Sequence, residues 1–139
     1  MGTNASIVVK KTDGKYIGVY VNFDGYLDHT GRLLKQIYNT YEKAIAVVGL
    51  GGISFLGERL APPEGSKHSW SKPIRGETVT YFRDAGEKFR QKRADTAEDA
   101  GYGTGYDYVF EDGEWTCNGM KFGVLPTGVW GYTYILDGM

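Results

Sequence analysis

The sequence has few of the residues that usually carry metal binding or nucleophilic catalysis. It contains one cysteine and two histidines in 139 residues, and Cys117, His29 and His68 are far apart, with no Cys-x-x-Cys or His-x-x-x-His spacing. A structural zinc site needs closely spaced ligands, and an α/β-hydrolase needs a Gly-x-Ser-x-Gly turn, which is also missing. We therefore expect no metal, no cofactor and no catalytic residue, and we interpret Cys117 as a small core residue.

Long apolar runs are missing as well. No stretch approaches the roughly 18–20 apolar residues that a membrane span requires. The first residues have neither the basic nor the apolar region of a secretory signal. A single cysteine rules out an internal disulfide framework and is typical of a reducing compartment. These features predict a cytosolic protein without a membrane partner.

Nucleotide-binding loops and catalytic carboxylate pairs also find little support. The glycines at 49–52 follow an expected helix rather than a strand, so they fit neither a Rossmann fingerprint nor a Walker loop. Asp24 and Asp28 flank a turn and a helix start, where capping favours carboxylates, and the acids at 111–114 lie on a hairpin tip. We interpret both groups of acids as structural.

Glycine and aromatic residues, in contrast, are abundant, and the charges are unevenly distributed. The chain has 21 glycines and 11 tyrosines, which is typical of a β-rich protein with many turns. Its net charge of −1 conceals a segment, 66–93, with eight Lys/Arg and three acids, and a segment, 94–139, with one Lys and eight acids. If the fold keeps these segments apart, the first forms a basic face suited to phosphates or acidic partners.

Periodicity and turn residues predict an α+β fold. Asp-Gly dipeptides at 13–14 and 112–113 each join two alternating segments into a hairpin, and Gly128 marks a third. Apolar positions at helical spacing predict a helical pair within 28–49, the second helix capped by Thr40 and ended by Gly49. We expect one domain, 1–139, with an antiparallel sheet of five to seven strands and the helical pair on one face. The expected strands are 6–11, 15–23, 77–83, 106–111, 114–117, 121–125 and 129–136, with a loop at 61–76 and a short helix around 87–94.

One side-chain constellation predicts binding. Tyr81, Phe82, Arg83 and Asp84 are expected at a strand end that opens into a charged loop, and an arginine fork beside aromatic rings is what phosphate and base recognition uses. The alternative is a surface ion pair of Arg83 with Asp84 or Asp24. On the binding interpretation, Arg83→Ala should leave the melting temperature nearly unchanged and weaken binding by about tenfold or more.

Two motifs resemble a family of small proteins encoded by tailed bacteriophages and prophages. These are Phe-Asp-Gly-Tyr at 23–26, continuing through Leu-Gly-Gly-Ile-Ser at 50–54, and Tyr-Phe-Arg-Asp-Ala-Gly-Glu at 81–87, followed by the segment 108–115. The family usually has His-Trp where this chain has Asn22-Phe23, and Gly where it has Phe82. The resemblance covers about residues 6–115 and adds Asp24 and Tyr26 to the expected ligand- or partner-binding site.

The resemblance implies a phage accessory protein in the cytoplasm of a bacterial host. Such proteins often counter host defence, as anti-CRISPR inhibitors do, by binding a defence protein stoichiometrically, and we take this as the leading hypothesis. The first alternative is a sequestering protein for a nucleotide-derived immune signal, which would use Arg83 with nearby aromatic rings. The second is a small hydrolase built on Asp24 and Glu87.

The apolar segment 122–136 raises the question of self-association. The segment 122–136 is unusually apolar for a chain end. It predicts either a central strand of the sheet or a surface for self-association into a symmetric homodimer or a higher homo-oligomer.

Overall fold

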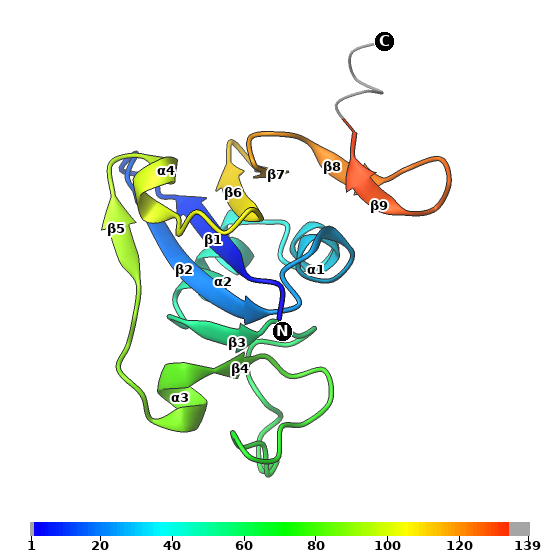
Figure 1. Cartoon of the computed structure of the whole chain (residues 1–139). Helices are drawn as coiled ribbons and strands as arrows, with labels where there is room; N and C mark the ends of the chain where they lie inside the picture. The colour runs from blue at the N-terminus through cyan, green and yellow to red at the C-terminus, as the bar shows by residue number, and fades with distance from the viewer. Residues whose placement is uncertain (1, 134–139) are drawn as a thin grey trace.

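Seven strands form one sheet in the computed structural model, which describes residues 2–133 (Figure 1). The sheet has the order β4-β3-β2-β1-β6-β7, and β5 pairs with the half of β2 that β3 does not reach. The predicted α+β class and the sheet of five to seven strands are confirmed, and the sheet, which was predicted to be antiparallel, is mostly so. The strands are β1 (Ala5–Lys10), β2 (Tyr16–Phe23), β3 (Ile53–Phe55), β4 (Val79–Thr80), β5 (Lys92–Ala94), β6 (Asp107–Glu111) and β7 (Glu114–Cys117).

Two strand pairings are parallel, namely β2 with β3 and β1 with β6. A parallel pair needs a long crossover, and residues 24–52 supply one between β2 and β3. This crossover holds a short π-helix (Leu27–Gly31), α1 (Arg32–Gln36) and α2 (Tyr41–Val48). As predicted, the Thr40 hydroxyl caps α2 by accepting the Lys43 N–H, and Gly49 follows its last residue.

The helical pair covers one face of the sheet, as the sequence predicted. Alternate residues of β1 and β2 point to this face and are fully buried, among them Ile7 and Val19. They share one core cluster with Leu34 of α1 and Val47 of α2. The crossover is tied to the sheet by the Tyr108 hydroxyl, which donates to the Gly25 carbonyl at 2.7 Å.

The opposite face of β1 and β2 is covered by α4 (Ala97–Ala100) (Figure 1). A Cβ atom at Gly18 would lie 1.8 Å from the Ala100 carbonyl oxygen, so the helix lies directly on the strand. The helix expected around 87–94 was therefore placed too early. Thr96 caps the real helix by accepting the Asp99 N–H, whereas residues 92–94 join the sheet as β5.

The strand expected at 77–83 is also wrong in its second half. Only Val79–Thr80 pairs with β3, and Tyr81–Ala85 forms the short helix α3. The Thr80 hydroxyl accepts the Arg83 N–H at 3.3 Å, and Gly86 ends the helix with φ of 70°. Capping chemistry at the two ends therefore outweighs the alternating pattern of the side chains.

The predicted third hairpin is present as β8 (Phe122–Val124) and β9 (Trp130–Tyr132), with its remaining residues after 133 outside the described part. It forms a two-stranded sheet of its own beyond β7, so the central-strand interpretation is wrong (Figure 1). Val124 and Val129 are among its exposed apolar residues. Self-association through this segment stays a prediction.

The two charged segments lie largely at different ends of the sheet. Most of the basic segment 66–93 surrounds β4 and α3, whereas the acidic segment contains α4, β6 and β7. The folded protein therefore keeps most of its positive charge near β4 and much of its negative charge near β6 and β7. Within residues 2–133, no helix has the length and apolar character needed to cross a membrane.

Candidate functional site

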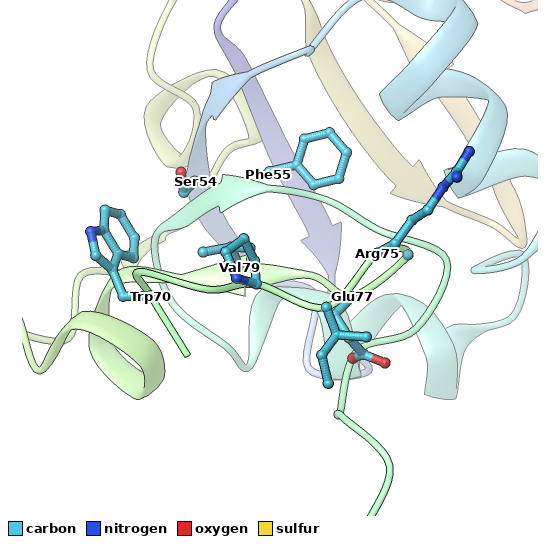
Figure 2. Close-up of a pocket in the computed structure, with 9 residues that line it drawn as sticks. Ser54, Phe55, Trp70, Arg75, Glu77 and Val79 are labelled. Atoms are coloured by element: carbon cyan, nitrogen blue, oxygen red, sulfur yellow. The ribbon is translucent and has the colours of Figure 1, made fainter. Parts of the chain in front are cut away.

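A pocket of about 500 Å³ opens beside β3 and β4, and we call it the β3 pocket (Figure 2). Residues of β3 and β4 form its floor, and the end of the long loop 61–76 forms its wall. Trp70 and Arg75 lie at its two ends, with Phe55 and Val79 between them. The lining residues are Ser54, Phe55, Trp70, Pro73, Ile74, Arg75, Gly76, Glu77 and Val79.

Trp70 is the most prominent side chain of the β3 pocket. It is 41% exposed although its ring packs against Tyr81 at a centroid distance of 5.2 Å. The Tyr81 hydroxyl in turn accepts a hydrogen bond from Asn22 Nδ2 at 2.7 Å. Asn22 of β2 therefore fixes Tyr81, and Tyr81 supports Trp70. The exposed part of the Trp70 ring is thus an apolar surface held in a defined position.

A second, smaller pocket of about 190 Å³ extends this surface past Phe55. It shares Phe55, Arg75 and Gly76 with the β3 pocket and adds His29 and Arg32. The His29 ring lies 4.7 Å from the Phe55 ring, and its Nε2–H donates to the Leu56 carbonyl at 2.8 Å. The combined groove therefore contains aromatic rings and two arginines, Arg75 and Arg32.

Arg83, the residue that the sequence favoured, is engaged within the protein. Its guanidinium donates to both carboxylate oxygens of Asp84, at 2.9 and 3.0 Å. It also donates to the Thr78 carbonyl at 2.7 Å and to the Leu60 carbonyl. Leu60 and Thr78 flank the loop 61–76, so Arg83 closes the base of the loop that forms the pocket wall.

His68 completes this arrangement from within the loop. Its Nδ1 accepts the Ile74 N–H at 3.0 Å, so the proton is on Nε2, which lies 3.3 Å from Asp84 Oδ2. The side chains of His68 and Asp84 are 1% and 6% exposed. No local pattern marks His68 in the sequence, because its partner is 16 positions away. We call Arg83, Asp84 and His68 the loop anchor.

The pKa of Asp84 reflects this environment. Burial raises the pKa of the carboxyl, but hydrogen bonds from Arg83, the Thr80 N–H and His68 outweigh burial and hold it below the ordinary 3.8. The carboxylate is therefore ionised at neutral pH and fully occupied by donors. It stabilises the fold and is not available as a general base.

Asp84→Asn should lower the free energy of unfolding at pH 7 by about 1–2 kcal/mol, because the neutral amide keeps the shape but loses charge-assisted hydrogen bonds. The folded-state pKa of Asp84 is depressed, so its stabilising effect is present above about pH 4 and is lost as the pH falls through the folded value. Urea unfolding at pH 7 and at about pH 2 should therefore show a difference that is smaller in acid. A deficit of the same size at both pH values would contradict this role.

The remaining predicted residues are dispersed. Phe82 is 52% exposed and packs on Phe89, with ring centroids 5.4 Å apart. Tyr26 is 40% exposed and lies 6.3 Å from the His29 ring, at the far end of the groove. Asp24 occupies a turn with φ of 56°, and its carbonyl accepts the Thr30 hydroxyl. Among the described residues Arg83 pairs with Asp84 and not with Asp24.

Cys117 and Glu77, two other side chains that could react, are both buried. Burial raises the pKa of Cys117 to about 11, so it is a neutral thiol at physiological pH. Glu77 is buried in the pocket wall and pairs with Arg59, while its Oε2 has no partner among the described residues. In residues 2–133 no three His, Cys, Asp or Glu side chains are arranged to hold a metal.

The fold and the groove define an α+β protein with an aromatic surface pocket flanked by arginines. None of the known family models, curated proteins or solved structures matches the chain. The sequence found Tyr81, which supports this pocket, but missed Trp70, Phe55 and Arg75. The available signal was Trp70 itself, a tryptophan in an otherwise polar loop, because tryptophan is enriched among the residues that contribute most to binding.

Proposed function

We propose that this chain is a phage accessory protein that acts in the cytoplasm of a bacterial host. It inhibits a host defence protein by binding it stoichiometrically, and the groove around Phe55, Trp70 and Arg75 forms the centre of the contact. One observation carries this proposal, namely a supported but 41% exposed Trp70 beside the β3 pocket. Tryptophan, tyrosine and arginine dominate the residues that contribute most to protein–protein binding.

Two carboxylates beside the β3 pocket, those of Asp84 and Glu77, are engaged within the protein, which favours binding over hydrolysis at this pocket. Asp84 is occupied by Arg83 and His68, and Glu77 is paired with Arg59. A hydrolytic site needs an acid or a base that can exchange protons with a substrate. Arg83 likewise donates to protein oxygens, so the guanidinium that a sequestering protein was expected to use is already engaged.

The proposal predicts that Trp70→Ala weakens binding of the defence protein by at least about tenfold. The melting temperature should fall by only a few degrees, because Trp70 is 41% exposed and belongs to a surface loop. The host partner is first captured from bacterial lysate with the wild-type chain and identified by mass spectrometry. Its affinity is then measured with purified components by calorimetry, which also reports the stoichiometry.

Val129→Ala is the matched control, because Val129 is also an exposed apolar residue but lies on the β8–β9 turn. Its affinity for the captured protein should equal that of the wild-type chain. Capture that is unaffected by Trp70→Ala would place the contact elsewhere. Turnover of the captured protein or of a small molecule would reject stoichiometric inhibition altogether.

A further inference from the structure

A third pocket lies on the opposite face of the sheet from α1 and α2, near α3 and α4. We call it the tyrosine pocket, because Tyr20 of β2, Tyr81 of α3 and Tyr102 after α4 provide its rings. It encloses about 240 Å³, and its other lining residues are Gly52, Glu87 and Arg90. These side chains come from five separate segments, so only the folded sheet brings them together.

The three rings are held in place by the protein itself. Tyr20 and Tyr102 meet edge to face, with centroids 5.5 Å apart. Lys92 Nζ lies 4.3 Å from the centre of the Tyr102 ring and is fixed there by donating to the Gly101 carbonyl at 3.0 Å. The Tyr81 hydroxyl is fixed by Asn22 Nδ2. Rings that are ordered in advance lose little conformational entropy when a ligand binds.

The floor of the tyrosine pocket is open because Gly52 has no side chain. A Cβ atom at Gly52 would have one neighbour within 4 Å, Tyr81 Cδ2 at 3.5 Å, which is an ordinary van der Waals contact. Gly52 is buried, and its φ is not in the left-handed region. The backbone therefore tolerates alanine, and the added methyl group would project toward the Tyr81 ring that lines the pocket.

Two charged groups of opposite sign line this pocket. Arg90 is exposed and takes part in none of the ion pairs found among the described residues. It lies close enough to Tyr102 for its positive charge to oppose the effect of burial, which raises the pKa of that phenol. Glu87 is also exposed, and its backbone N–H donates to the Tyr81 carbonyl at 3.0 Å, which holds the main chain at the rim of the pocket. The pocket thus offers aromatic faces, one cation and one hydrogen-bond acceptor.

We propose that the tyrosine pocket binds a nucleoside monophosphate. The base stacks on the tyrosine rings, its exocyclic amino group donates to Glu87, and the phosphate lies against Arg90. Bases that are splayed out of a helix are commonly recognised by stacking on tyrosine and by hydrogen bonds to their edges. Pockets that hold a whole small molecule usually enclose about 300–1,000 Å³. The tyrosine pocket, at about 240 Å³, is smaller than that, so it holds the base while the ribose and phosphate extend toward its rim. This site shares no lining residue with the β3 pocket, although Tyr81 also supports Trp70 there, and it does not depend on the proposed inhibitor function.

The test is calorimetric titration of the full chain with AMP, GMP, CMP and UMP, and with adenosine as the ligand that lacks the phosphate. At least one amino-bearing monophosphate should bind saturably with a dissociation constant below about 1 mM. UMP, whose base has no amino group, should bind more weakly. Arg90→Gln should remove the advantage of AMP over adenosine without affecting the affinity for adenosine.

Gly52→Ala and Tyr102→Ala should each weaken binding of the preferred monophosphate by at least about tenfold. Val129→Ala, which shortens an exposed side chain of the β8–β9 hairpin outside the pocket, should have no effect. Gly52→Ala is the decisive variant if Tyr102→Ala fails to fold, because its Cβ makes only an ordinary contact. Absence of binding for all four monophosphates, or wild-type affinity in Gly52→Ala, would overturn the proposal and would leave the inhibitor proposal unaffected.

Discussion

Arg83→Ala is expected to lower the free energy of unfolding by about 3 kcal/mol, or about 10 °C in melting temperature for a chain of this size. The substitution removes the donors that satisfy Asp84, whose side chain is only 6% exposed. It also frees the carbonyls of Leu60 and Thr78. Removing one partner of a buried ion pair typically costs about 3–5 kcal/mol, and the partial exposure of Arg83 places the loss at the lower end. Thermal unfolding followed by circular dichroism at pH 7 measures it.

Two further variants separate the loop anchor from a general effect of charge. Arg75→Ala removes an arginine from the same loop region, but among the described residues the Arg75 side chain has no ion pair, so its melting temperature should stay within about 2 °C of wild type. Arg83→Ala combined with Asp84→Asn should cost less than the sum of the single changes, because the two residues share one interaction. An Arg83→Ala protein that melts like the wild-type chain would contradict the structural role of the loop anchor.

The sheet hairpins could be predicted from the sequence because their turn residues are local and specific. Asp13-Gly14 and Asp112-Gly113 join the predicted strand pairs, and both glycines have positive φ. The Thr40 cap was predicted for the same reason, since the hydroxyl and the N–H that it accepts are three residues apart. Features that depend on neighbouring residues are the ones that a single sequence reveals.

The segment 81–87 shows how two local signals can compete. Its alternating residues predict a strand, whereas Thr80 and Gly86 are the cap residues of a short helix. The caps prevail because β4 has only two residues paired with β3, so the ladder offers few hydrogen bonds beyond them. This change of element turns the Arg83 guanidinium toward the base of the loop 61–76, where it donates to the carbonyls of Leu60 and Thr78.

Both pockets depend on contacts between distant segments and could not be predicted. The β3 pocket needs β4 beside β3 and the loop 61–76 folded back on them, and the loop anchor that holds it combines residues 16 positions apart. The tyrosine pocket needs α4 to bring Tyr102 against Tyr20. The residue types alone predicted a binding site with aromatic rings near the basic segment 66–93. Which aromatic rings come into contact depends on the order of the strands, which the sequence does not show.

Gly18→Ala should lower the free energy of unfolding by about 3 kcal/mol or more, because the new methyl group has no space. Its Cβ would lie 1.8 Å from the carbonyl oxygen and 2.8 Å from the carbonyl carbon of Ala100, and these backbone atoms cannot rotate away. Helix α4 would have to lift from β2, which would also separate Tyr102 from Tyr20. Overpacking costs typically about 1–3 kcal/mol, and a backbone clash this severe belongs at or above the upper end. Urea unfolding at 25 °C measures the change.

The sign of the change in the free energy of unfolding shows whether α4 covers Gly18 or leaves it open. At an uncovered position within a strand, alanine is more stable than glycine by about 0.5–1 kcal/mol, because glycine loses more backbone entropy on folding. Gly52→Ala is the matched control, since the same methyl group meets its nearest neighbour at 3.5 Å and should change stability by less than about 1 kcal/mol. If Gly18→Ala is as stable as the wild-type chain, α4 does not lie on β2, and the tyrosine pocket loses the element that positions Tyr102.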